Sequence, residues 1–148
     1  MKLIRSSIIA VAFFCGQIQA GSIDACLTSA AQHHGVDPML LRAIASVESS
    51  FNPTAVGKNV NGTQDRGLMQ INDWWLPKLT QFGITRKDLM DPCVSAYVGA
   101  WILSQELVRH GRTWRAVGAY NSPTAKNQEI YVRKVQRKLN ELVSLHRH

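Results

Sequence analysis

The chain has 148 residues, of which 45% are hydrophobic and 18% charged, and this composition permits one globular domain with a packed core. It contains 17 Lys and Arg and ten Asp and Glu, a net charge of +7 that is compatible with an acidic cell wall, anionic lipids or nucleic acid. The basic residues are scattered and lack interleaved aromatic residues, which argues against a nucleic-acid-binding or membrane-active protein.

Residues 1–20 have the order of a secretory signal peptide. Lys2 and Arg5 precede an apolar run over residues 8–15 that is too short to span a bilayer comfortably, and Ala20 suits the position before a cleavage site. The alternative is a retained membrane anchor. Cleavage after Ala20 would leave one domain, residues 21–148, with a net charge of +5 and no stable membrane span. We expect this domain to be a monomer, periplasmic or secreted.

The first two predicted helices cover residues 22–34 and 38–50. Gly35 ends the first helix, and Asp37 followed by Pro38 gives the second helix an N-cap and a favoured first residue. The second helix ends before Asn52-Pro53, which places Glu48 in its last turn. A carboxylate there faces the negative end of the helix dipole, so we expect its pKa to be raised.

The polar stretch over residues 52–66 contains Asn61-Gly62, a tight-turn signal, and predicts a loop or small hairpin. A turn or short helix at residues 67–71 and a short helix at 74–82 follow. Further helices are expected over residues 92–110, 114–120 and 125–145. Val94, Tyr97, Val98, Trp101, Ile102 and Val108 predict that the first of these is the central buried helix, and Ile130, Val135, Leu139 and Leu142 form the apolar side of the last. The fold class is mainly α.

Three short segments carry the chemistry: residues 48–53 (ESSFNP), 67–72 (GLMQIN) and 119–121 (AYN). Each is weak alone, but together and in this order they resemble the catalytic domain of the lytic transglycosylases, over about residues 26–139. The resemblance implies a lysozyme-like, goose-type fold and a peptidoglycan glycan-strand substrate. The chain's size, signal peptide, cysteine pair and residues 64–72 (QDRGLMQIN) are most similar to the small enzymes that accompany type III and type IV secretion systems. A secretion-system or pilus component is therefore an expected partner.

The resemblance also implies roles for individual residues. Glu48 matches the single acid and base of the family, Ser49 follows it as the pattern expects, and Tyr120 matches the tyrosine that hydrogen-bonds the glutamate. Residues expected to contact the sugar are Ser49, Met69, Gln70, Tyr120 and Asn121. Protonating a glycosidic oxygen requires an acid whose pKa is raised, and apolar neighbours such as Phe51 and Met69 would achieve this by desolvation.

Asp65 lies just before this second segment. It could stabilise a cationic transition state, orient a water or bind sugar, or it could merely cap the turn at Gly67. Trp74 and Trp75 could stack on sugar rings, although we expect at least one of them in the core.

Cys26 and Cys93 are the two cysteines of the predicted mature chain, and an isolated pair in an exported protein predicts a disulfide. Their spacing does not indicate zinc, so we expect neither a metal nor another cofactor. Two other functions remain open: a hydrolytic muramidase that uses Glu48 and Asp65, and a non-catalytic peptidoglycan-binding accessory protein. The second is disfavoured because binding alone does not need an acid at position 48.

Overall fold

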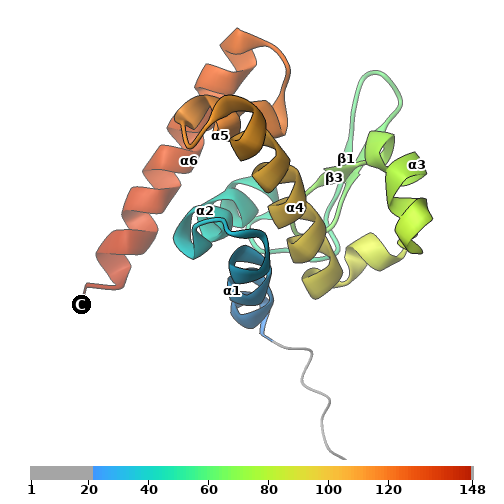
Figure 1. Cartoon of the computed structure of the whole chain (residues 1–148), viewed down its shortest axis with the longest axis horizontal. Helices are drawn as coiled ribbons and strands as arrows, with labels where there is room; N and C mark the ends of the chain where they lie inside the picture. The colour runs from blue at the N-terminus through green and yellow to red at the C-terminus, as the bar shows by residue number, and fades with distance from the viewer. Residues whose placement is uncertain (1–21, 148) are drawn as a thin grey trace, which may run out of the picture.

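The computed structural model describes residues 22–147, so the predicted signal peptide in residues 1–20 lies outside the described residues. The described chain is mainly α-helical, as predicted, with a small antiparallel sheet (Figure 1). Its α-helices are α1 (Ile23–His34), α2 (Pro38–Ser49), α3 (Leu76–Leu79), α4 (Pro92–His110), α5 (Trp114–Asn121) and α6 (Ala125–Leu145). Among residues 22–147, no helix combines the length and the apolarity needed to cross a membrane.

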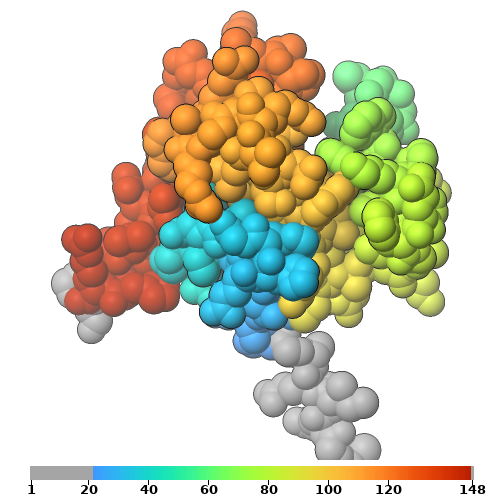
Figure 2. Space-filling view, in the orientation of Figure 1, coloured from blue at the N-terminus to red at the C-terminus, as the bar shows by residue number. Residues whose placement is uncertain are grey.

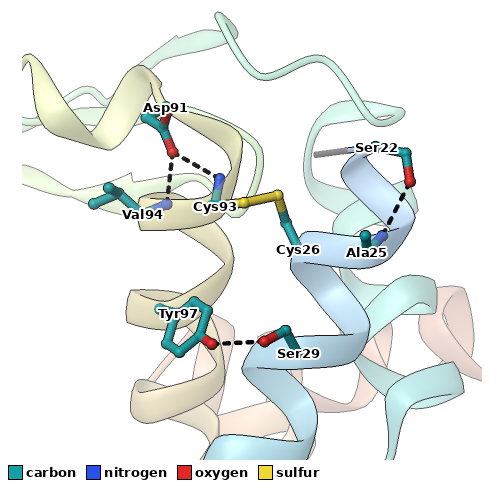
Figure 3. The surroundings of a disulfide bond; sticks show 8 residues. All are labelled: Ser22, Ala25, Cys26, Ser29, Asp91, Cys93, Val94 and Tyr97. Carbon is teal, nitrogen blue, oxygen red and sulfur yellow. Dashed lines mark hydrogen bonds between the residues drawn. A yellow bond between two sulfur atoms is a disulfide. The ribbon is translucent and has the colours of Figure 1, made fainter. Parts of the chain in front are cut away.

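Short-range capping signals fix most helix ends at the predicted positions. Asp37 accepts a hydrogen bond from the backbone N–H of Leu40 at 2.8 Å, and Pro38 begins α2. Asp91 accepts hydrogen bonds from two N–H groups in the first turn of α4 (Figure 3). Thr113 precedes α5, but its side chain makes no cap hydrogen bond.

Helix α4 runs through the middle of the molecule, where it packs against α1 and α5, while α2 packs against α6 (Figure 1). The large side chains that are fully buried come from many elements: Leu27, Leu41, Ile44, Leu68, Met69, Ile71, Leu89, Leu103 and Val135. The prediction that α4 is central is therefore confirmed. The apolar face predicted for α4 was wrong at Val108, which is 86% exposed because it lies off the side of the helix that is buried. That side comprises Ser95, Ala96, Val98, Gly99, Ala100, Ile102, Leu103 and Glu106.

The sheet consists of β1 (Val56–Lys58), β2 (Gln64–Arg66) and β3 (Ile71–Asn72) in the order β1-β2-β3. β1 and β2 form the hairpin predicted around Asn61-Gly62, with Gly62 at a φ of 85°. In the sheet register, Asp65 lies between Gly57 on β1 and Asn72 on β3. The hairpin and α3 form a lobe on the opposite side of α4 from α6 (Figures 1 and 2).

A disulfide joins α1 to the first turn of α4. Cys26 and Cys93 are bonded, with their Cα atoms 4.7 Å apart, as predicted from the isolated pair (Figure 3). One turn further along, the hydroxyls of Ser29 and Tyr97 lie 2.7 Å apart and form a hydrogen bond that also links the two helices. The covalent bond spans a sequence separation of 67 residues, and the closed segment contains α2 and the sheet, so it constrains the elements that carry the first two of the three sequence segments.

The predicted short helix over residues 74–82 is divided into a 3₁₀ turn at Asp73–Trp75, α3, and a second 3₁₀ turn at Thr80–Phe82 that Gly83 ends. Trp75 packs against the core and stacks edge-on with Trp101, at 5.4 Å between ring centroids. Trp74 is 71% exposed. The expectation that at least one of the two tryptophans belongs to the core is confirmed.

Candidate active site

Glu48 lies in the last turn of α2 and opens into a cleft of about 290 Å³. The cleft is bounded by α2, the end of α5 and the first half of α6. Its lining residues are Val47, Glu48, Asn121, Asn127, Ile130, Tyr131 and Lys134. Glu48 is only partly exposed, whereas the two asparagines are open to solvent. The cleft therefore offers one desolvated carboxyl group surrounded by accessible polar side chains.

The pKa of Glu48 is raised to about 7, mainly because the carboxyl group is buried and to a smaller extent because the carboxylate of Asp65 is nearby. Two influences oppose the increase: the hydrogen bond from Tyr131 and the positive charge of Lys134 both lower the pKa. The direction agrees with the prediction from desolvation. A carboxyl group with a pKa near neutrality can donate a proton in one step and accept one in the next.

Tyr131, on α6, donates a hydrogen bond from its hydroxyl to Oε1 of Glu48 at 2.5 Å. The expectation that Tyr120 makes this bond was wrong, because its hydroxyl instead donates to the carbonyl of Met69 at 2.8 Å. Burial, followed by the charge of Glu48, raises the pKa of both tyrosines well above the usual value. Both phenols therefore remain hydrogen-bond donors at neutral pH.

Helical periodicity in the sequence indicates that Tyr131 is buried. Tyr131, Val135 and Leu139 recur at helical spacing, and the first two are buried. Ile130, which was expected on that apolar side, is 40% exposed and borders the cleft. A tyrosine in a buried helical stripe needs a partner for its hydroxyl, and this requirement pointed to a polar group on the facing helix.

Asp65 occupies the middle of β2 with both carboxylate oxygens engaged. Oδ2 accepts a hydrogen bond from Asn59 Nδ2 at 2.9 Å, and Oδ1 accepts one from Asn72 Nδ2 at 2.8 Å. Asp65 does not cap the turn at Gly67, whose N–H donates to the carbonyl of Ala55 at 2.8 Å. The structure thus holds a second carboxyl group in fixed orientation, close enough to raise the pKa of Glu48.

The turn over residues 67–70 joins β2 to β3 and is hydrogen-bonded to the end of α2. Ser49 donates a hydrogen bond from Oγ to the carbonyl of Leu68 at 2.7 Å, and Gln70 donates from Nε2 to the carbonyls of Ala55 and Gly67. These bonds keep the turn beside Glu48, so both side chains act here as supports for the site. Their predicted contacts with sugar remain predictions.

Glycine is required at position 67. The residue has a φ of 76°, and a Cβ atom there would lie 1.9 Å from the carbonyl oxygen of Leu89. Met69, two residues later, is 0% exposed and packs on Gly99 of α4. The expectation that the Met69 side chain lines the sugar groove was therefore wrong. Asn121, in contrast, lies in the cleft beside Glu48, as its predicted role requires.

Comparison with known proteins assigns the chain to a family. The profile of the transglycosylase SLT domain matches residues 25–142. The chain belongs to the transglycosylase SLT domain family. This membership confirms the predicted enzyme class, a lytic transglycosylase, and the match contains each of the three sequence segments singled out above.

Two proteins of similar sequence are small. The invasion protein IagB of Salmonella typhi is 42% identical over 125 residues, covering 79% of this chain and 78% of that protein. Protein IpgF of Shigella flexneri is 39% identical over 105 residues, covering 70% of this chain and 69% of that protein. The likeness to such proteins agrees with the expected small single-domain subgroup.

The fold is also that of a solved lytic transglycosylase. An inactive mutant of the lytic transglycosylase Slt from Pseudomonas aeruginosa superimposes with a TM-score of 0.63 at 24% identity. The match covers 78% of this transglycosylase domain and 23% of the much longer Slt chain. The expected lysozyme-like fold is therefore confirmed. Within residues 22–147, no three His, Cys, Asp or Glu side chains are grouped in a way that could hold a metal ion.

Proposed function

We propose that this lytic transglycosylase cleaves the β-1,4 bond between N-acetylmuramic acid and N-acetylglucosamine in peptidoglycan and forms a 1,6-anhydromuramyl product. The proposal depends on the environment of Glu48. Its pKa is raised to about 7, it lines an open cleft, and its Oε1 accepts a hydrogen bond from the Tyr131 hydroxyl. A glycan strand is a long substrate that needs an open cleft, and the reaction needs an acid that is protonated near neutral pH.

One carboxyl group suffices for both steps of this reaction. Protonated Glu48 gives its proton to the glycosidic oxygen as the bond from that oxygen to C1 of the muramyl ring breaks, which leaves an oxocarbenium-like centre. The Glu48 carboxylate then takes the proton of the C6 hydroxyl on the same ring while the C6 oxygen bonds to C1. No water is consumed, and Glu48 returns to its starting state. Tyr131 would orient the carboxyl group in both steps.

The position of Asp65 supports a role as an assisting group in the transglycosylase reaction. It also supports the alternative function, a hydrolytic muramidase. Its carboxylate is held by two asparagine amides and acts electrostatically on Glu48. A negative charge there stabilises a cationic transition state in either reaction, whereas only hydrolysis needs it to orient a water. The products separate these possibilities.

Mass spectrometry of muropeptides released from purified peptidoglycan by residues 21–148 tests the reaction. Anhydro products, each lighter by one water than the corresponding reducing sugar, are expected, and reducing-end products would instead identify a muramidase. Glu48→Gln should lower the rate about 10²–10⁴-fold and keep binding to sedimented peptidoglycan. Full activity of Glu48→Gln would refute the assignment of Glu48, and binding without cleavage by the wild type would indicate an accessory binding protein.

We also propose that the enzyme acts in the periplasm or outside the cell and opens the wall locally for a secretion apparatus or pilus. The predicted signal peptide and the Cys26–Cys93 disulfide favour an oxidising compartment. The likeness to a protein named for invasion supports the association with secretion. Fractionation of cells that express the full chain would test the location, and a cytosolic protein with free thiols would contradict it.

A further inference from the structure

The cleft beside Glu48 is bordered by one basic side chain, Lys134. This residue lies on α6, three positions after Tyr131, and is exposed where it lines the cleft. Its ammonium group is close enough to lower the pKa of Glu48, so the charge reaches the part of the cleft where the bond is broken. The exposed amides of Asn121 and Asn127 border the same cleft. This wall therefore offers a cation together with neutral hydrogen-bonding groups.

Among the described basic residues of α6, only Lys134 both lines the cleft and lacks an ion pair; Lys126 and Arg137 also lack one but lie outside the cleft lining. Arg133 pairs with Glu129 at 2.6 Å, and Lys138 pairs with Glu141 at 2.6 Å. In the part of the chain that the structure describes, neither an ion pair nor a hydrogen bond joins Lys134 to an acidic side chain. Packing does not explain Lys134 either, because its side chain is exposed. A ligand that enters the cleft thus meets an ammonium group available for pairing.

The chemistry of the proposed substrate indicates which part of it would use that charge. The N-acetylated sugars of the glycan backbone are neutral, and the lactyl group of muramic acid is amide-linked to a stem peptide that carries free carboxylates. That peptide is attached to the muramyl ring whose C1–oxygen bond Glu48 would protonate. The anionic group that comes nearest to the acid is therefore a carboxylate of the stem peptide.

We propose that Lys134 binds a stem-peptide carboxylate of the muramyl residue being cleaved, so that the enzyme prefers peptide-bearing glycan strands to strands without charged stems. This inference rests on the proposed function and adds a specificity-determining residue to the same site. Asn127 lies two turns before Lys134 on α6 and lines the same cleft, where its amide can hydrogen-bond the peptide backbone. An exposed pair of this kind contributes modestly, and its strength falls as salt screens it.

The pairing would also act on the acid. The titratable groups that face Glu48 are Asp65 on β2, Tyr120 on α5, and Tyr131 and Lys134 on α6. Lys134 lowers the pKa of Glu48, so a carboxylate that pairs with Lys134 would weaken this effect and favour protonated Glu48. A peptide-bearing strand would thus promote the acid form required for the first step.

Two substrates test the proposal: strands with intact stem peptides, and strands whose stem carboxylates have been amidated with carbodiimide and ammonium chloride. For the wild type, kcat/KM on intact strands should exceed that on amidated strands about three- to tenfold at low salt. Lys134→Gln should reduce this ratio to about one, and Lys134→Arg should restore it. Arg133→Gln, which removes the same charge from the same helix outside the cleft, should keep the wild-type ratio.

Two results would overturn the proposal. The first is a wild type with equal kcat/KM on the two substrates. The second is a wild-type ratio retained in Lys134→Gln, because an equal loss of kcat/KM on both substrates would mean that Lys134 acts only on Glu48. A wild type that cleaves none of the strands would refute the proposed function instead. Binding then decides the inference separately: a Glu48→Gln protein should bind intact strands about three- to tenfold more tightly than amidated ones, and Glu48→Gln with Lys134→Gln should bind both alike.

Discussion

Replacing Glu48 by glutamine should increase the free energy of unfolding relative to the wild type more at pH 8 than at pH 4. The reason is that ionisation of this buried carboxyl group destabilises the wild-type fold. The pKa of Glu48 is about 7 in the fold against an ordinary value of 4.5. Between these values the unfolded chain has lost the proton and the folded chain still holds it. The contribution of Glu48 to the free energy of unfolding therefore falls by about 1.4 kcal/mol per pH unit, or about 3 kcal/mol in all. Glutamine does not titrate and avoids this loss.

Urea unfolding of residues 21–148 at pH 4, 6 and 8 measures the effect. The difference in unfolding free energy between Glu48→Gln and wild type cancels the other titrating groups, and it should be constant below pH 4.5 and rise toward pH 7. Any lost hydrogen bond with Tyr131 adds an offset that does not vary over this range. Glu129→Gln, on the exposed surface of α6, controls for removal of a carboxylate. A difference that stays flat from pH 4 to pH 8 would refute desolvation as the origin of the raised pKa.

Tyr131→Phe should raise the pKa of Glu48 by about 1–2 units, since it removes a charge-assisted hydrogen bond that lowers this pKa. The descending limb of the plot of kcat/KM against pH should then move to higher pH, and an unmoved limb would contradict the pairing. Asp65→Asn should reduce turnover, lower the pKa of Glu48 and leave folding nearly unchanged; wild-type turnover would limit Asp65 to a structural role. Cys26→Ser with Cys93→Ser should cost about 4 kcal/mol of stability and lower the Tm by roughly 15 °C in calorimetry, and an unchanged Tm would count against the chain-entropy argument.

The sequence was sufficient for features that depend on neighbouring residues. Asp37 and Asp91, each followed by proline, fix the first turns of α2 and α4 because their side chains cap N–H groups two or three residues away. Gly35 ends α1 because a left-handed residue closes the helix without help from distant parts of the chain. The position of Glu48 in a helix end followed from the same local signals.

The partners of Glu48 were decided by the tertiary structure. Tyr131 and Glu48 are 83 residues apart, and their hydrogen bond exists because α6 packs across α2 with that face inward. Helical periodicity leaves the direction of such a face uncertain by a residue, which is why Ile130 was expected inside and Tyr131 was overlooked. Tyr120, on α5, likewise finds its partner in a distant part of the chain, the carbonyl of Met69 51 residues earlier.

Burial was likewise settled by neighbours that the sequence does not identify. Met69 is covered because Gly99 lets the turn approach α4 closely. Val108, at 86% exposure, lies on a side of α4 that the described elements leave uncovered. Sequence periodicity records which residues share a side, whereas the packing of distant elements determines whether that side is covered. For this protein, local sequence therefore determined the helices and the acid, and tertiary packing determined the electrostatic surroundings that make the acid suitable for catalysis.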